Sequence, residues 1–197
     1  MKRVELAHIL RAASQIANDR DVVIVGSQSI LGSYDEDDLP DEAIGSIEAD
    51  VTFFGPNAEH KALLVEAAIG EDSPFHSMYG YYGQGVEIDG LIVLPDGWRD
   101  RVVVWSSNSS APGRAHCLEP HDLAVTKLAA FREKDLEFVA ALIGAQLLDP
   151  ALLVERLGAA PLSAPHRRRL LAWVRAVGPD ELTSDESPSG PSRDDPS

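Results

Sequence analysis

The chain has 197 residues, with an apolar fraction of 44% and a charged fraction of 25%, which are ordinary values for one globular domain. No apolar run is long enough to cross a bilayer, no signal-peptide segment opens the chain, and Cys117 is its one cysteine, so we expect a cytoplasmic protein without membrane contact or an internal disulfide. The formal charge of −15 argues against broad attraction to nucleic acid, although a local basic patch at residues 167–169 stays compatible with it.

The first part of the chain predicts a helix, a buried strand and a tight turn. Residues 4–17 carry apolar side chains at mostly helical spacing, which indicates an amphipathic helix that packs on a sheet. Residues 22–25 are all apolar, as in a strand buried on both faces, and Gly26 and Ser27 follow before a helix expected around residues 28–31. A helix start attracts anions, glycine permits close approach and serine adds a hydroxyl donor, so we interpret this turn as a phosphate cradle.

Residues 47–54 predict a second strand that carries two acids, after an acidic stretch at residues 33–45 that we expect to form an exposed loop or short helix. Successive side chains of a strand point to opposite faces, so Glu48 and Asp50 would share one face. Carboxylates suit Mg²⁺ and also Mn²⁺, so the pair is a candidate metal site facing the phosphate cradle. A half-solvated strand without a ligand shows the same alternation, and that interpretation stays open.

The middle of the chain predicts a helix, a loop and two further strands. A helix is expected from Pro56 to about Ile69, and the turn-rich residues 73–85 indicate a loop. Residues 86–89 repeat the alternation of apolar and acidic side chains, which makes Asp89 a candidate third carboxylate on the metal face. Another strand is expected at residues 101–105.

The last part of the chain predicts helices. Apolar positions after Pro120 support a helix through about Val139, in which Lys127 and Asp135 stand eight residues apart, about 80° around an unbroken α-helix. They would share one broad face toward a cleft, although ordinary charged helix faces look the same. Residues 151–177 indicate one or two further helices, and the end of the chain, rich in Asp, Glu, Ser and Pro, predicts a disordered tail.

Two segments of the sequence, taken together, resemble a known superfamily. Val-Gly-Ser at residues 25–27, followed by Ile-Glu-Ala-Asp-Val at residues 47–51, is similar to the signature of the DNA polymerase β-like nucleotidyltransferases, a Gly-Ser turn before two acids on a strand. Residues 118–136 are similar to the helical motif of AbiEii-type and related bacterial toxin-like nucleotidyltransferases. The resemblance covers about residues 20–140 and implies an α/β (α+β) fold, a mixed β-sheet packed by helices with a helical C-terminal portion.

The resemblance also implies roles for the candidate site residues. The Gly-Ser turn and a lysine would hold the phosphates of a nucleoside triphosphate, and these residues are Gly26, Ser27 and Lys127. Glu48 and Asp50 would bind the metal, and Asp135 would support the cleft. The resemblance does not identify a third metal-binding carboxylate, for which Asp89 is the candidate from strand alternation. The expected domains are a nucleotidyltransferase-like core at residues 1–115, a helical portion at 116–178 that closes the cleft, and an acidic tail at 179–197.

The expected activity is metal-dependent transfer of a nucleoside monophosphate from a nucleoside triphosphate to a hydroxyl acceptor, with release of pyrophosphate. The related toxin-like enzymes imply that the acceptor is the 3′ end of transfer RNA or a protein, that the protein is the toxin of a bacterial toxin–antitoxin pair, and that an antitoxin is a candidate partner. A small-molecule acceptor, as in antibiotic-modifying relatives, stays open as well. Two alternatives stay open. One is a catalytically inactive nucleotidyltransferase fold that binds nucleotide or regulates a partner, and the other is an unrelated α/β protein whose acids are solvated.

Overall fold

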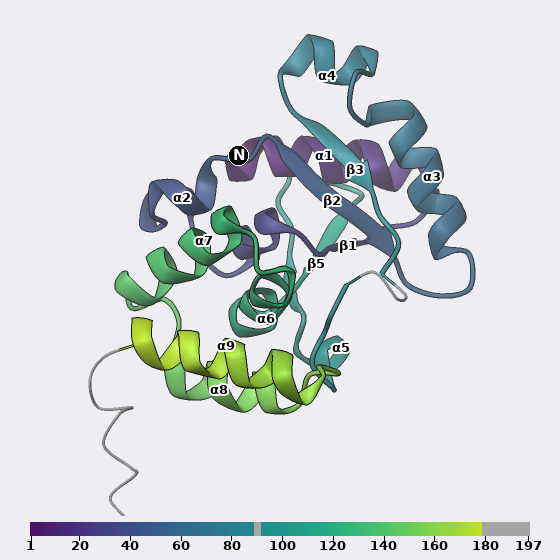
Figure 1. Ribbon diagram of the computed structural model, residues 1–197. Coiled ribbons are helices and arrows are strands. Elements are labelled where there is room, and N and C mark those ends of the chain that lie inside the picture. The colour runs from purple at the N-terminus through teal and green to yellow at the C-terminus, as the bar shows by residue number, and fades with distance from the viewer. Residues whose placement is uncertain (89–91, 179–197) are drawn as a thin grey trace, which may run out of the picture.

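The computed structural model describes residues 1–88 and 92–178, which form a mixed sheet surrounded by helices (Figure 1). Five strands in these ranges follow the order β3-β2-β1-β5-β4 across the sheet. Strand β1 is antiparallel to β2 and parallel to β5, β2 is parallel to β3, and β4 is antiparallel to β5. The strands are β1 (Asp21–Ile24), β2 (Glu48–Phe53), β3 (Tyr82–Gly85), β4 (Val103–Trp105) and β5 (Arg114–Cys117).

The helices of the described chain belong either to its first part or to a C-terminal portion. The first part of the chain carries α1 (Arg3–Ile16), the 3₁₀ helices η1 (Ser27–Gly32) and η2 (Glu36–Asp38), α2 (Asp41–Ile44), α3 (Ala58–Ile69), α4 (Pro74–Tyr79) and α5 (Trp98–Arg101). The C-terminal portion consists of α6 (Pro120–Ala130), α7 (Glu133–Gly144), α8 (Pro150–Gly158) and α9 (Ala164–Val177), which lie together beside the sheet (Figure 1). This arrangement confirms the predicted fold class, a mixed sheet packed by helices with a helical C-terminal portion.

One face of the sheet packs against α1 and α3. Ala49 of β2 is fully buried and pairs in register with Gly83 of β3. A Cβ atom built on Gly83 would lie 3.0 Å from Ile69 of α3 and 3.1 Å from Ile9 of α1, so both helices approach this face closely. Side chains alternate along a strand, and the two acids of β2 therefore point to the opposite face, on the side of α6 and α7.

The prediction of a loop at residues 73–85 is wrong, because the structure has a helix and a strand there. Ser73 caps α4 by accepting a hydrogen bond from the backbone N–H of His76, at 3.1 Å. Gly80, with φ of 77°, ends α4 in the left-handed region that favours glycine. Strand β3 then pairs with β2. The strand expected at residues 86–89 therefore lies four residues earlier, at residues 82–85, and the described part of the expected segment is not a strand.

The prediction of one unbroken helix from Pro120 to Val139 is also wrong. Helix α6 ends at Ala130, because Phe131 adopts a left-handed backbone with φ of 52°, and α7 begins two residues later. This conformation costs a residue other than glycine about 1 kcal/mol. The Phe131 ring is covered by the Arg169 guanidinium of α9, whose central carbon lies 3.7 Å from the ring centroid. The break lets α7 pack beside α6 (Figure 1).

The other predicted elements are confirmed, with ends that agree to about two residues. The helix expected after the Gly-Ser turn is the short 3₁₀ helix η1, and the acidic stretch contains η2 and α2. Strand β5 was not expected from the sequence. Residues 179–197, the predicted disordered tail, and Asp89, the predicted third carboxylate, lie outside the described residues. The division of the chain into a core at residues 1–115, a helical portion at 116–178 and a tail at 179–197 stays a prediction.

Candidate active site

Gly26, shortly after the end of β1, lies against Asp50 in the middle of β2. The backbone N–H of Val25 donates to the Asp50 carbonyl at 3.1 Å, which holds the two segments side by side. A Cβ atom built on Gly26 would lie 1.5 Å from Asp50 Oδ2, which is far inside contact distance. Glycine is therefore the residue that this position accepts while the Asp50 carboxylate keeps its place.

Glu48 lies on the same face of β2 as Asp50, as the alternation predicted, and Tyr82 of β3 holds its carboxylate. Glu48 and Tyr82 pair in register across β2 and β3, and the Tyr82 hydroxyl donates to Glu48 Oε2 at 2.9 Å. Burial and this hydrogen bond to the Glu48 carboxylate raise the pKa of Tyr82. The phenol therefore stays protonated and donates a hydrogen bond to one oxygen of Glu48.

The charge on Asp50 is costly in the structure as it stands. Burial raises the pKa of Asp50, and the neighbouring charge of Glu48 raises it further, although the cations Lys127 and Arg132 act in the opposite direction. The net shift is upward, so positive charge at this point would be favourable. The described residues contain no cluster of three or more His, Cys, Asp or Glu side chains suited to a metal ion.

Lys127 joins the turn after β1 to the helical portion. Its Nζ donates to Ser27 Oγ at 2.7 Å and lies 3.2 Å from Asp135 Oδ1. Asp135 has no exposed side-chain surface, and it also accepts a hydrogen bond from Arg132, whose Nε lies 2.5 Å from Oδ2. Burial raises the pKa of Asp135, but its bonds to Arg132 and the charge of Lys127 outweigh burial, and the net pKa is lowered. Asp135 therefore stays ionised and orients two cations.

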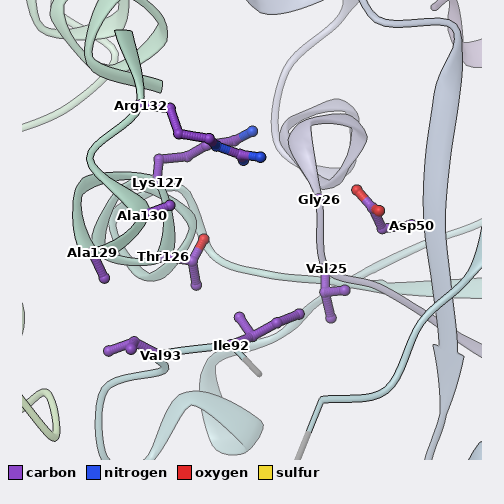
Figure 2. A pocket seen from close by; sticks show the side chains of 10 residues that line it. All are labelled: Val25, Gly26, Asp50, Ile92, Val93, Thr126, Lys127, Ala129, Ala130 and Arg132. Atoms are coloured by element: carbon purple, nitrogen blue, oxygen red, sulfur yellow. The ribbon is translucent and has the colours of Figure 1, made fainter. Parts of the chain in front are cut away.

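Two adjoining cavities meet at these residues. The apolar cavity, of about 390 Å³, is lined mainly by Val25, Ile92, Val93, Thr126, Ala129 and Ala130. The charged cavity, of about 500 Å³, is lined by residues that include Ser27, Glu48, Lys134 and Asp135. Three residues line both cavities, namely Asp50, Lys127 and Arg132. In Figure 2, Lys127 and Arg132 extend toward the space in front of Gly26 and Asp50, with aliphatic side chains to one side.

This arrangement of a Gly-Ser turn, paired acids and facing cations suits a phosphate ester substrate with a metal ion. A family model described as "Nucleotidyltransferase of unknown function (DUF6036)" matches residues 4–166. The chain belongs to this nucleotidyltransferase family. Comparison with curated proteins and with solved structures gives no significant match.

The nucleotidyltransferase match runs from α1 into the first turn of α9 and so includes both walls of the cleft. The structure brings six of the seven predicted site residues to this cleft, and these are Gly26, Ser27, Glu48, Asp50, Lys127 and Asp135. The seventh, Asp89, lies outside the described residues. No helix in the described parts of the chain is both long and apolar enough to pass through a bilayer.

Sequence reasoning missed two contributors to the nucleotidyltransferase cleft. Arg132 lines both cavities and keeps 60% of its side-chain surface exposed while it contacts Asp135. Its spacing of three residues before Asp135 was the signal that could have indicated it. Tyr82 was assigned to a loop, and its contact with Glu48 depends on the pairing of β3 with β2, for which the sequence carried no local signal.

Proposed function

We propose that this member of the nucleotidyltransferase family moves a nucleoside monophosphate from a nucleoside triphosphate to a hydroxyl acceptor, with Mg²⁺ or Mn²⁺ as the cofactor. One observation carries the proposal: Asp50, beside the side-chain-free Gly26, faces Lys127 and Arg132 across a single cleft. The acids suit a divalent cation, and the cations suit the phosphates that such a cation accompanies. A metal ion bound to phosphate needs carboxylates on one side and cations on the other, and the cleft has both.

Glu48 and Asp50 fit a divalent cation. Both are carboxylates on one face of β2, and the raised pKa of Asp50, caused by burial and by the Glu48 charge, marks a place where positive charge is favourable. The Tyr82 hydroxyl fixes the Glu48 carboxylate through Oε2, and the remaining lone pairs of the carboxylate would be available to the cation. A bound Mg²⁺ would offset charge on the phosphates and on the attacking oxygen.

The helical wall would bind the phosphates that leave. Lys127 and Arg132 carry fixed positive charge into the cleft, and the Ser27 hydroxyl, already held by Lys127, adds a donor. Helix η1 is a 3₁₀ helix of six residues, so we assign most of the attraction for phosphate to these side chains and not to a helix dipole. Asp135 does not reach solvent, and its role is to orient the two cations.

In the proposed reaction the acceptor oxygen forms a bond to the α-phosphorus, and the bond from that phosphorus to the β-phosphate oxygen breaks. Pyrophosphate leaves with the bonding electrons, and the hydroxyl proton passes to water. The chain would accelerate this exchange mainly by positioning and by fixed charges. We propose the 3′ end of transfer RNA or a protein as the acceptor, in the cytoplasm, with the protein acting as a toxin that an antitoxin partner restrains.

The decisive experiment is incubation of the full chain with Mg²⁺, each nucleoside triphosphate labelled at the α-phosphate, and a bacterial extract that contains RNA and protein. We expect label on one class of acceptor, and loss of at least 100-fold of that signal in Asp50→Ala. Glu137→Ala is the matched control, because Glu137 is an exposed acid on α7 that is not among the described lining residues of either cavity. Equal labelling by Asp50→Ala and wild type would refute the mechanism.

An inactive relative is the second candidate, because no third carboxylate joins Glu48 and Asp50 among the residues that the structure describes. Such a protein would bind a nucleoside triphosphate in the same cleft without releasing pyrophosphate. Magnesium-dependent binding in calorimetry, together with no labelled acceptor and no pyrophosphate, would favour this candidate over the enzyme.

A further inference from the structure

The two cavities of the cleft differ in chemistry and meet at Asp50. The charged cavity contains hydroxyl, carboxylate and ammonium groups, whereas the apolar cavity is lined by aliphatic side chains from three segments, namely Val25 directly after β1, residues 92–93, and residues 129–130 of α6. Asp50 lines both cavities, together with Lys127 and Arg132. The acid therefore stands at the junction between an apolar half and a charged half of one continuous cleft (Figure 2).

A nucleoside triphosphate has the same division of chemistry. Its base has two apolar faces, its β- and γ-phosphates carry most of the negative charge, and the α-phosphate joins the two parts. We propose that the apolar cavity binds the nucleoside part of the substrate, so that the β- and γ-phosphates occupy the charged cavity and the α-phosphate lies at Asp50. This inference rests on the proposed function and adds the direction in which the substrate lies.

The apolar cavity suits a nucleoside better than it suits a sugar-rich molecule. Its volume of about 390 Å³ falls in the range of small-molecule sites. Among the described residues that line it and not the charged cavity, Thr126 has the one polar side chain, and its hydroxyl already donates to the Leu123 carbonyl at 2.7 Å. A sugar-rich acceptor would leave most of its hydroxyls without partners there, whereas the faces of a base need none.

The same lining predicts weak selection between bases. Because the Thr126 hydrogen is used within α6, this side chain offers the substrate an acceptor and no donor. Aliphatic walls distinguish ligands of similar shape only weakly, whereas strong selection requires several directed hydrogen bonds. We expect a purine and a pyrimidine nucleotide to bind with dissociation constants that differ by no more than about tenfold.

The test separates the nucleoside from the phosphates. Calorimetry on the full chain with Mg²⁺ would compare inorganic tripolyphosphate with the α,β-methylene analogues of ATP and CTP, which cannot transfer their nucleoside monophosphate. Ala130→Trp adds a large side chain to the apolar cavity at an exposed helix position. Ala172→Trp is the matched control, an exposed alanine on α9 that does not belong to the cavity lining as described.

We expect Ala130→Trp to weaken both analogues at least tenfold and to change tripolyphosphate affinity less than twofold, while Ala172→Trp changes neither. Unchanged tripolyphosphate affinity also shows that the variant is folded. Two results would overturn the inference and leave the proposed function standing: analogue binding that resists Ala130→Trp, or a wild-type chain that binds the analogues no better than tripolyphosphate. A wild-type chain that binds neither ligand would refute the proposed function itself.

Discussion

Lys127 and Asp135 form an ion pair, with 3.2 Å between Nζ and Oδ1, although they lie on separate helices. The left-handed turn at Phe131 between α6 and α7 brings them together. Asp135 is completely buried and also holds Arg132, so an acid without exposed surface controls both cations that line the two cavities. The positive wall of the cleft therefore depends on the packing of α7 beside α6.

Asp135→Asn should weaken the binding of magnesium tripolyphosphate by about tenfold, equivalent to about 1.4 kcal/mol. Asparagine keeps the shape of the side chain but loses the charge that orients Lys127 and Arg132. Calorimetry with the purified variant measures the change. Glu137→Gln, at an exposed position of α7, is the control for a lost negative charge. Wild-type affinity in Asp135→Asn would mean that the carboxylate does not orient the cations.

Asp50→Asn should raise the melting temperature of the protein at pH 7 in a buffer with EDTA. Burial and the Glu48 charge raise the folded-state pKa of Asp50 above its ordinary value of 3.8, so the ionised carboxylate destabilises the fold at neutral pH. The cost is present above the raised folded-state pKa and disappears below about 3.8, where the carboxyl is protonated in both states.

Thermal unfolding between pH 3 and pH 8 tests this sign. The difference in melting temperature between Asp50→Asn and wild type should be positive at neutral pH and should vanish at the acidic end, while Glu137→Gln shows no such trend. A lower melting temperature for Asp50→Asn at pH 7 would contradict the assigned cost of the charge.

Gly26→Ala should reduce nucleotidyl transfer by at least about 100-fold, because a Cβ atom there would lie 1.5 Å from Asp50 Oδ2 and the carboxylate would have to move. The same overlap should lower the free energy of unfolding by about 1–3 kcal/mol. Gly144→Ala is the control, since nothing lies within 4 Å of a Cβ atom at that position of α7. It should be neutral or stabilising by up to about 1 kcal/mol. Urea unfolding and the transfer assay measure both effects, and an active Gly26→Ala would disprove the close packing.

Tyr82→Phe should raise the Mg²⁺ concentration that gives half-maximal nucleotide binding, by about threefold to tenfold. The change removes the hydroxyl that holds Glu48 Oε2 at 2.9 Å and frees the carboxylate to rotate away from the cation. Tyr81→Phe is a matched control, because it removes a hydrogen bond of the same length, to His8 Nδ1, away from the acids. Each variant should lose about 1 kcal/mol of stability. A magnesium dependence that shifts equally in both variants would argue against a specific role for Tyr82.

The sequence by itself determined the features that depend on local backbone geometry. Two acids separated by one residue share a face of any strand, so the position of Glu48 and Asp50 followed from strand alternation alone. The turn at Gly26 followed in the same way from the end of an all-apolar strand. Helical spacing likewise predicted α1 and the helical character of the C-terminal portion, though not the break between α6 and α7, because the period of 3.6 residues is a property of one segment.

Only the tertiary structure decided which of these segments meet. The spacing of Lys127 and Asp135 suggested a shared face of one helix, yet they meet through a break that Phe131 makes possible and that the Arg169 side chain covers. The contact between Tyr82 and Glu48 required β3 to pair in parallel with β2, a pairing between segments 34 residues apart. Pairing over such a distance depends on packing of the whole core and not on the composition of either segment, so the cationic wall and the support of Glu48 emerged only in three dimensions.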